Sequence, residues 1–128
     1  MQQIAVAILQ KDGRVLIGQR PEGSDLAGYW EFPGGKLKSG ETPEQCAVRE
    51  CQEELHVTVG HLALLDTLEY TYPHKTLRLH FFTGQILQGE AQCLVHRQLL
   101  WVDIQKLGQY AFCPANAPVI HRLMQSAQ

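Results

Sequence analysis

The sequence predicts a single α+β domain that spans residues 1–128. Stretches with the composition of β-strands lie on both sides of one strongly marked helix, and a second helix follows near the C-terminal end. This order differs from the regular alternation of strand and helix that builds a parallel sheet. A length of 128 residues with 45% hydrophobic residues suits one domain around one core.

A hairpin is predicted at the start of the chain. Ile4–Leu9 predicts a strand, Lys11–Gly13 has the composition of a tight turn, and Arg14–Arg20 predicts the partner strand. Arg20 ends that strand, where it is either a plain surface cation or a contact for a phosphate or a base edge. Pro21–Gly28 has turn-forming residues and no periodicity, which predicts a loop able to act as a lid.

The main helix is predicted from Pro43 to Leu55. Thr42 is a favourable N-cap, Pro43 suits the first helical position, and Gln45 completes a capping box with Thr42. The pair Gly34–Gly35 precedes this helix, and glycine lets the backbone approach a ligand closely enough for a carbonyl to reach a metal.

Glutamates are expected to gather on one side of this helix. The i+3 and i+4 spacings predict one acidic face, formed by Glu50, Glu53 and Glu54. They predict an apolar stripe on the opposite side, formed by Ala47, Val48, Cys51 and Leu55. Like charges at these spacings cost about 0.2–0.5 kcal/mol per pair. A divalent cation would turn this repulsion into coordination, and hard oxygen ligands suit Mg²⁺ or Mn²⁺. The helix alone does not decide between a metal site and a solvated acidic face.

A second hairpin and a final helix complete the expected elements. Leu62–Tyr72 and Thr76–Leu87 predict two long strands around a turn at 73–75. Alternation within the second strand predicts a sheet with one buried face, formed by Leu77, Leu79 and Phe81, with Arg78, His80 and Phe82 on the other. Leu99–Val102 predicts a short strand, and Pro118–Gln125 a helix capped at or near Asn116.

Composition excludes several classes of protein. The first 13 residues lack a basic and apolar leader, and no stretch approaches the length of a membrane span, so we expect a cytoplasmic protein without a membrane partner. The four cysteines form no CxxC pair, which favours reduced thiols, and the CxxH at Cys93 and His96 has no second pair to complete a zinc site. Net charge is −2 with no basic cluster, so a small anionic ligand is favoured over a nucleic-acid polymer.

The stretch Gly34–Val57 resembles the Nudix box, which combines a glycine, spaced glutamates and an Arg-Glu pair. The matching residues are Gly35, Glu41, Arg49, Glu50, Cys51, Glu53, Glu54, Leu55 and Val57. One position departs, because His56 stands where the family has a glycine that closes the helix in a left-handed conformation. A side chain there costs about 1–2 kcal/mol. We interpret the change as a small loss of stability that leaves the metal ligands intact.

The resemblance implies a Nudix fold, in which a mixed β-sheet is sandwiched between α-helices, and a hydrolase that depends on Mg²⁺ or Mn²⁺. It implies four metal ligands, the carbonyl of Gly34 and the carboxylates of Glu50, Glu53 and Glu54. Glu50 or Glu53 would take a proton from the attacking water, while Arg49 tethers the glutamates. Glu41 is either a ligand or a support.

Within the family, the chain is similar to the branch that hydrolyses 8-oxo-dGTP and so removes a mutagenic nucleotide from the pool. The similar residues are Ile4–Val6, Arg20, Glu31–Lys36, Gly40–Gln45, Leu68–Tyr70 and Pro114–Ile120. This similarity implies four substrate contacts: Arg20 and Phe32 at the base, Lys36 at a phosphate and Asn116 at the purine edge.

The chemistry of Asn116 fits this role. An amide offers an acceptor and a donor together, whereas guanine presents two acceptors at N7 and O6. In 8-oxoguanine N7 carries a proton, so one amide can pair with the oxidised base and not with the normal one. The alternative is that Asn116 only caps the last helix.

Three functions therefore remain open at this point. The main one is hydrolysis of 8-oxo-dGTP, and the second is hydrolysis of CTP, dCTP or another modified nucleotide by a related enzyme. The third is a non-catalytic nucleotide-sensing domain.

The related branch also carries a glutamate near the C-terminal end of the chain, at the place where this chain has Val95 and His96. A metal ligand or proton acceptor is therefore either missing or supplied by His96. We expect a monomer whose partner is a nucleoside triphosphate.

Overall fold

The computed structural model describes residues 1–126. Its elements are, in chain order, β1 (Gln2–Lys11), β2 (Arg14–Gln19), β3 (Trp30–Glu31), β4 (Gly34–Lys36), α1 (Pro43–Leu55), β5 (Thr58–Tyr72), β6 (Lys75–Gln88), β7 (Gln98–Asp103), the 3₁₀ helices η1 (Ile104–Gln109) and η2 (Pro114–Asn116), and α2 (Ala117–Ser126). The two predicted hairpins, the strand at 99–102 and both helices are confirmed. Helix α1 has its predicted ends, and the other elements differ by a few residues at their ends.

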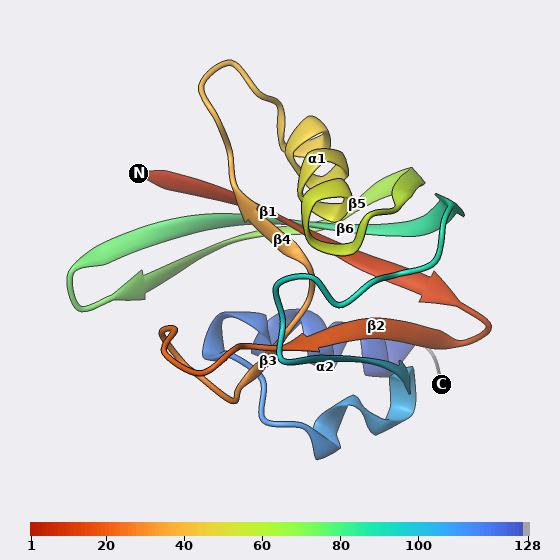
Figure 1. Cartoon of the computed structure of the whole chain (residues 1–128). Coiled ribbons are helices and arrows are strands. Elements are labelled where there is room, and N and C mark those ends of the chain that lie inside the picture. The colour runs from red at the N-terminus through yellow and green to blue at the C-terminus, as the bar shows by residue number, and fades with distance from the viewer. Residues whose placement is uncertain (127–128) are drawn as a thin grey trace.

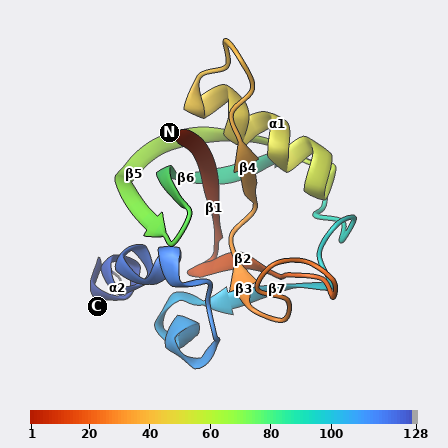
Figure 2. The same cartoon turned by 90° about the vertical axis from the view of Figure 1, so that its left-hand side faces the viewer.

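The strands form a mixed sheet. Its order is β3-β2-β1-β6-β5, with β4 paired to β1 and β7 paired to β2. Strand β1 runs parallel to β6 and antiparallel to β2 and β4. Figures 1 and 2, two views 90° apart, show α1 on one side of the strands and α2 on the other. The expected architecture, a mixed sheet between helices, is confirmed.

The core lies in two layers around β1. Ile8 belongs to the cluster that contains Val119 of α2, whereas its neighbours Ala7 and Leu9 belong to the cluster that contains Leu55 of α1. Residues 5–9 are consequently buried on both faces of the sheet, as in a central strand covered by helices on both sides.

Strand β6 corrects one prediction. Leu77, Leu79 and Phe81 are buried as expected, but Phe82 on the opposite face is also buried, with 4% of its surface exposed. It packs with Cys46 and other residues beneath α1. The helix covers this part of the face, so both faces of β6 are buried there.

Helix α1 has the predicted ends and caps. The Thr42 hydroxyl accepts a hydrogen bond from the Gln45 backbone N–H, and the Gln45 side chain accepts one from the Thr42 N–H, which completes the capping box. His56 closes the helix with φ = 57°, the left-handed conformation expected of the family glycine. Val48 is 37% exposed and not part of the buried stripe, in which Cys46 lies instead.

Four short elements were not predicted, namely β3, β4, η1 and η2. Helix α2 begins at Ala117 and directly follows the 3₁₀ turn η2. Within residues 1–126, no helix is both long and apolar enough to cross a membrane.

Candidate active site

Two of the helix glutamates point into the protein. A turn of roughly 100° per residue places Glu50 and Glu54 between the buried Cys46 and Ala47 when α1 is viewed along its axis. Their side chains are 15% and 12% exposed, whereas that of Glu53 is 53% exposed. The predicted separation of an acidic face from the apolar stripe is therefore wrong for Glu50 and Glu54.

The glycine turn makes room for one of these carboxylates. A Cβ atom at Gly35 would lie 2.5 Å from the Cδ of Glu50, so any side chain at this position would collide with the carboxylate. A Cβ atom at Gly34 would collide with the backbone oxygen of Ala5 in the paired strand β1. The two glycines thus hold β4 against the sheet and bring its backbone next to Glu50.

Arg49 joins the acidic residues of this stretch. Its Nε and Nη2 atoms donate to the two oxygens of Glu41 at 2.7 and 2.9 Å, in a bidentate pair. Its Nη1 atom donates to Glu50 at 2.7 Å and to Glu53 at 3.0 Å. A further bond reaches the carbonyl of Lys36 at 3.0 Å. Arg49 therefore tethers the glutamates, and Glu41 supports Arg49.

The environments of Glu41 and Glu54 are opposite. Hydrogen bonds from Arg49, and then from the Lys38 backbone, lower the pKa of Glu41 to about 2. Burial, and then the neighbouring Glu50, together raise the pKa of Glu54 to about 9. A nearby cation would therefore stabilise the ionised form of the Glu54 carboxyl.

The chemistry of this donor set fits a hard divalent cation. Glu50 and Glu54 supply carboxylate oxygens beside the backbone of β4, and a cation there would offset both the burial of Glu54 and its repulsion by Glu50. Within the described residues, no three carboxylate, imidazole or thiol groups already form a metal cage. Glu53 faces Arg49, so the predicted set of Gly34, Glu50, Glu53 and Glu54 remains a prediction.

A cavity of about 880 Å³ adjoins this cluster. It brings together all four predicted substrate contacts, which are Arg20, Phe32, Lys36 and Asn116, and it includes Gly34 and Gly35. Sequence reasoning missed the tip of the β5–β6 hairpin, residues 72–75, and Cys113, which also line the cavity. An aromatic residue and a cation in the turn, Tyr72 and Lys75, were the available signal at the hairpin tip.

Asn116 and Phe32 form part of the cavity wall. The Nδ2 atom of Asn116 donates to the carbonyl of Cys113 at 3.1 Å, an orientation that leaves the Oδ1 atom for a ligand. The side-chain amide thus donates to the residue that precedes η2, whereas a cap of α2 would have its oxygen accept from a backbone N–H of that helix. Phe32 is 3% exposed, and its ring lies 5.4 Å from that of Phe112 at an angle of 31°.

Glu31 connects the two parts of the site. Its Oε1 accepts from Arg20 at 3.1 Å and its Oε2 pairs with the Nε2 of His96 at 3.0 Å. The same Nε2 lies 4.0 Å from Glu54, so His96 is next to the glutamate cluster. Cys93 donates to the backbone carbonyl of His96, so the CxxH motif brings its thiol to the backbone and not to the imidazole.

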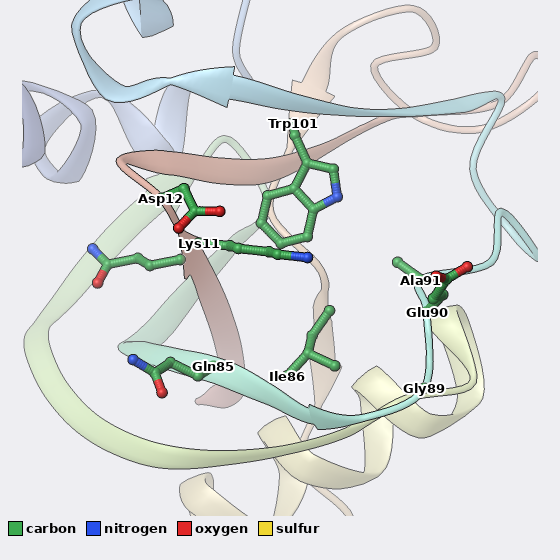
Figure 3. Close-up of a pocket in the computed structure, with 9 residues that line it drawn as sticks. Lys11, Asp12, Gln85, Ile86, Gly89, Glu90, Ala91 and Trp101 are labelled. Carbon is green, nitrogen blue, oxygen red and sulfur yellow. The ribbon is translucent and has the colours of Figure 1, made fainter.

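A second cavity lies elsewhere on the molecule (Figure 3). Its volume is about 590 Å³, and its lining comes from the β1–β2 turn, the end of β6, the segment after β6 and Trp101 of β7. None of the predicted site residues lines it. The larger cavity is therefore the candidate active site.

Comparisons with known proteins agree with this geometry. A model of the NUDIX domain matches residues 4–122. The 8-oxo-dGTP diphosphatase of Escherichia coli K12 is 38% identical over 122 residues, which cover 94% of this chain and 95% of that protein. The CTP pyrophosphohydrolase of the same organism is 35% identical over 126 residues, which cover 97% and 92%.

Solved structures give the same result. A structure from work on MutT of Aliivibrio salmonicida and Vibrio cholerae has a TM-score of 0.86 at 30% identity and covers 98% of both chains. The solution structure of the E. coli ORF135 protein has a TM-score of 0.81 at 33% identity, with 98% of this chain and 89% of that one covered.

Proposed function

This chain belongs to the Nudix family of hydrolases, and from that membership we propose that it hydrolyses 8-oxo-dGTP to 8-oxo-dGMP and pyrophosphate. Removal of this nucleotide from the pool prevents its incorporation into DNA. Support comes from the relatives named 8-oxo-dGTP diphosphatase and from the four cavity residues that the sequence assigned to substrate binding.

The orientation of the Asn116 amide is the observation that carries the proposed base choice. Because its nitrogen is bonded to Cys113, its oxygen is left to accept a hydrogen bond from the cavity. The N7 proton of 8-oxoguanine supplies that bond, and the second amide hydrogen can reach O6. Unmodified guanine would set the N7 lone pair against the amide oxygen, which leaves two buried acceptors unpaired.

The proposed metal site uses the Gly34 carbonyl, Glu50, Glu53 and Glu54. When bound there, Mg²⁺ or Mn²⁺ would neutralise the triphosphate and lower the pKa of a bound water. Glu50 or Glu53 takes a proton from the attacking water, whose oxygen forms a bond to the β-phosphorus. The bridging oxygen leaves with the α-phosphate, so the products are the monophosphate and pyrophosphate.

Two further residues have assigned roles. Arg49 holds Glu50 and Glu53 in position through its Nη1 atom, so the proton acceptor stays oriented whichever glutamate acts. Lys36 lies on β4 next to the glycines and lines the cavity, where its ammonium group can contact a phosphate. Arg20 and Phe32 bind the base end.

A second substrate class is favoured by one specific observation. The relative named CTP pyrophosphohydrolase matches nearly the whole chain at 35% identity, close to the 38% of the diphosphatase. Hydrolysis of CTP or dCTP is therefore the alternative activity. The fold and the glutamate cluster are equally compatible with both substrates.

A panel of nucleoside triphosphates distinguishes these functions. We expect pyrophosphate release with Mg²⁺ to be fastest for 8-oxo-dGTP, with a kcat/KM above that for dGTP by about 10- to 150-fold per unpaired group. A higher value for CTP or dCTP would support the alternative. Binding without pyrophosphate release for any nucleotide would indicate a sensing domain.

A further inference from the structure

His96 is a buried polar residue that the proposed chemistry does not use. Among residues 1–126, only two polar or charged residues are buried, and Asn116 already has a role in the base pocket. The side chain of His96 is 2% exposed, and its ring does not line the cavity. It is therefore shielded from a bound nucleotide.

Strand β2 is shaped to receive this ring. Gly18 pairs with Glu31 across the β2–β3 ladder, and a Cβ atom at position 18 would lie 2.6 Å from the Cδ2 of His96. Glycine in the middle of a strand is normally unfavourable, so its presence here indicates close approach by another group. The imidazole lies over Gly18 and reaches Glu31 on the neighbouring strand.

The contacts of the two ring nitrogens show which of them carries the proton. The Nε2 atom lies 3.0 Å from the Oε2 of Glu31, and the Nδ1 atom has no partner among the described residues. An ionised carboxylate can only accept, so Nε2 carries the proton and the ring is a donor. The other oxygen of Glu31 accepts a hydrogen bond from Arg20. Both oxygens of the carboxylate therefore have a donor, His96 inside the protein and Arg20 at the cavity wall.

We propose that His96 is a positioning residue, which fixes the carboxylate of Glu31 and through it the guanidinium of Arg20 at the base end of the cavity. This inference rests on the proposed function only in taking the cavity as a nucleotide site. Loss of the donor at His96 would let the Glu31 carboxylate rotate. The Nη1 atom of Arg20 would then lose its fixed partner, and only the bond from its Nε to the Asp25 carbonyl would remain. The effect is expected on nucleotide binding and base preference, with little change in the chemical step.

Two substitutions of similar size separate hydrogen bonding from packing. Leucine at position 96 removes the donor, whereas glutamine carries an amide nitrogen near the position of Nε2. We expect His96→Leu to raise KM and the dissociation constant of the nucleoside monophosphate product by about tenfold, as for loss of a hydrogen bond to a charged group. His96→Gln should restore both to within about threefold of the native values, and kcat should stay within about threefold in both variants.

A glycine pair and a double variant provide independent tests. Gly18→Ala should displace the ring and reproduce the rise in KM. Gly60→Ala is the same change in another strand, where the new Cβ atom meets the exposed side chain of Leu87, and should not raise KM. In a Glu31→Gln background, His96→Leu should add no further effect, because the two residues act in series. Thermal unfolding of each variant identifies any that fail to fold.

Several results would overturn the inference. Equal losses in His96→Leu and His96→Gln would indicate a packing role, and native values in both would indicate no role. A fall in kcat at constant KM would assign His96 to the glutamate cluster and not to Glu31. The measurement uses whichever triphosphate the native protein hydrolyses fastest, with its monophosphate for binding, so a failure of the 8-oxo-dGTP proposal is detected separately by the native substrate panel.

Discussion

The two ends of the active-site cavity are built in different ways. The box end comprises Gly34–Lys36, which line the cavity, and the α1 glutamates next to them, which are not among its lining residues. It comes from one continuous stretch and is tied together by Arg49. The base end comprises Arg20, Phe32, residues 72–75 and residues 113–116, which are far apart in the sequence. The box end is a network of ion pairs within one stretch, whereas the base end combines separate apolar and cationic side chains with one amide, that of Asn116, held by the Cys113 carbonyl.

This difference assigns separate tasks to the two ends. At the box end each charged group depends on its neighbours, so most substitutions there would leave an unpaired charge. At the base end, under the proposed function, a change in Asn116 should alter which base fits and leave the charges untouched. Relatives named for different nucleotides match this chain over nearly its whole length at 38% and 35% identity, as such a division would allow.

The strongest test of this division is substitution of Glu54, one of the proposed metal ligands. Glu54→Gln should lower kcat by roughly 10²–10⁴-fold for every nucleotide, without changing the order of preference, because an amide binds a divalent cation far more weakly. EDTA should have the same effect on the native protein. Initial rates of pyrophosphate release measure both.

Glu44→Gln is the matched control, since Glu44 is an exposed residue in the first turn of the same helix. It should leave kcat near the native value. Turnover close to native in EDTA would contradict the metal-dependent mechanism, and a change in base preference in Glu54→Gln would contradict the separation of the two ends.

The base end is tested by Asn116→Ala. This change should lower kcat/KM for 8-oxo-dGTP by about 10- to 150-fold while dGTP is little affected, because only the oxidised base pairs with the amide. Steady-state kinetics on both substrates measure the ratio. Gln105→Ala serves as control, since Gln105 donates a similar bond to the carbonyl of Met124 outside the cavity. A retained preference for the oxidised base would show that Asn116 has only a structural role.

The box end was more predictable than the base end because its signals are local. The capping residues and the glycines lie within a few residues of the helix they define, and α1 has its predicted ends. The direction of Glu50 and Glu54 was not predictable in the same way. Periodicity groups residues on a helix, but only the sheet beneath α1 decides which group is buried.

Elements that depend on distant partners were missed for the same reason. Strands β3 and β4 have two and three residues, too few for any periodicity, and they exist because they pair with β2 and β1. Likewise, the contact of His96 with Glu31 joins residues 65 positions apart. Resemblance supplied Arg20 and Asn116, but not the hairpin tip that lies beside them in the cavity.

A pH experiment tests the protonation of the buried Glu54 carboxyl in the metal-free protein. The folded chain keeps a proton on Glu54 up to about pH 9, whereas the unfolded chain loses it near pH 4.5. The folded state therefore binds more protons in this range, and stability falls as pH rises. One proton gives a slope of at most about 1.4 kcal/mol per pH unit.

Denaturant unfolding in EDTA measures this slope as the difference between the native protein and Glu54→Gln, which should have the smaller slope around pH 7. Burial also raises the pKa of Cys46, Cys51 and Cys113, which makes stability fall in both proteins as pH approaches 9. His80 has a lowered pKa because of burial, so it makes stability rise with pH around and below pH 6.5, and this opposite contribution is the same in both proteins. Equal slopes in the native and variant proteins would show that Glu54 is ionised without a metal.

The smallest expected effect concerns His56, the departure from the family pattern at the box end. Its φ of 57° lies in the left-handed region, so His56→Gly should raise the free energy of unfolding by about 1 kcal/mol as the steric cost of a side chain is removed. His56→Ala is the control, because it removes the ring but keeps the Cβ atom and should give no gain. Unchanged kcat in both variants would place His56 outside the chemistry, whereas a fall in kcat without a change in stability would assign the exposed imidazole a part in the reaction and extend the box end beyond its glutamates.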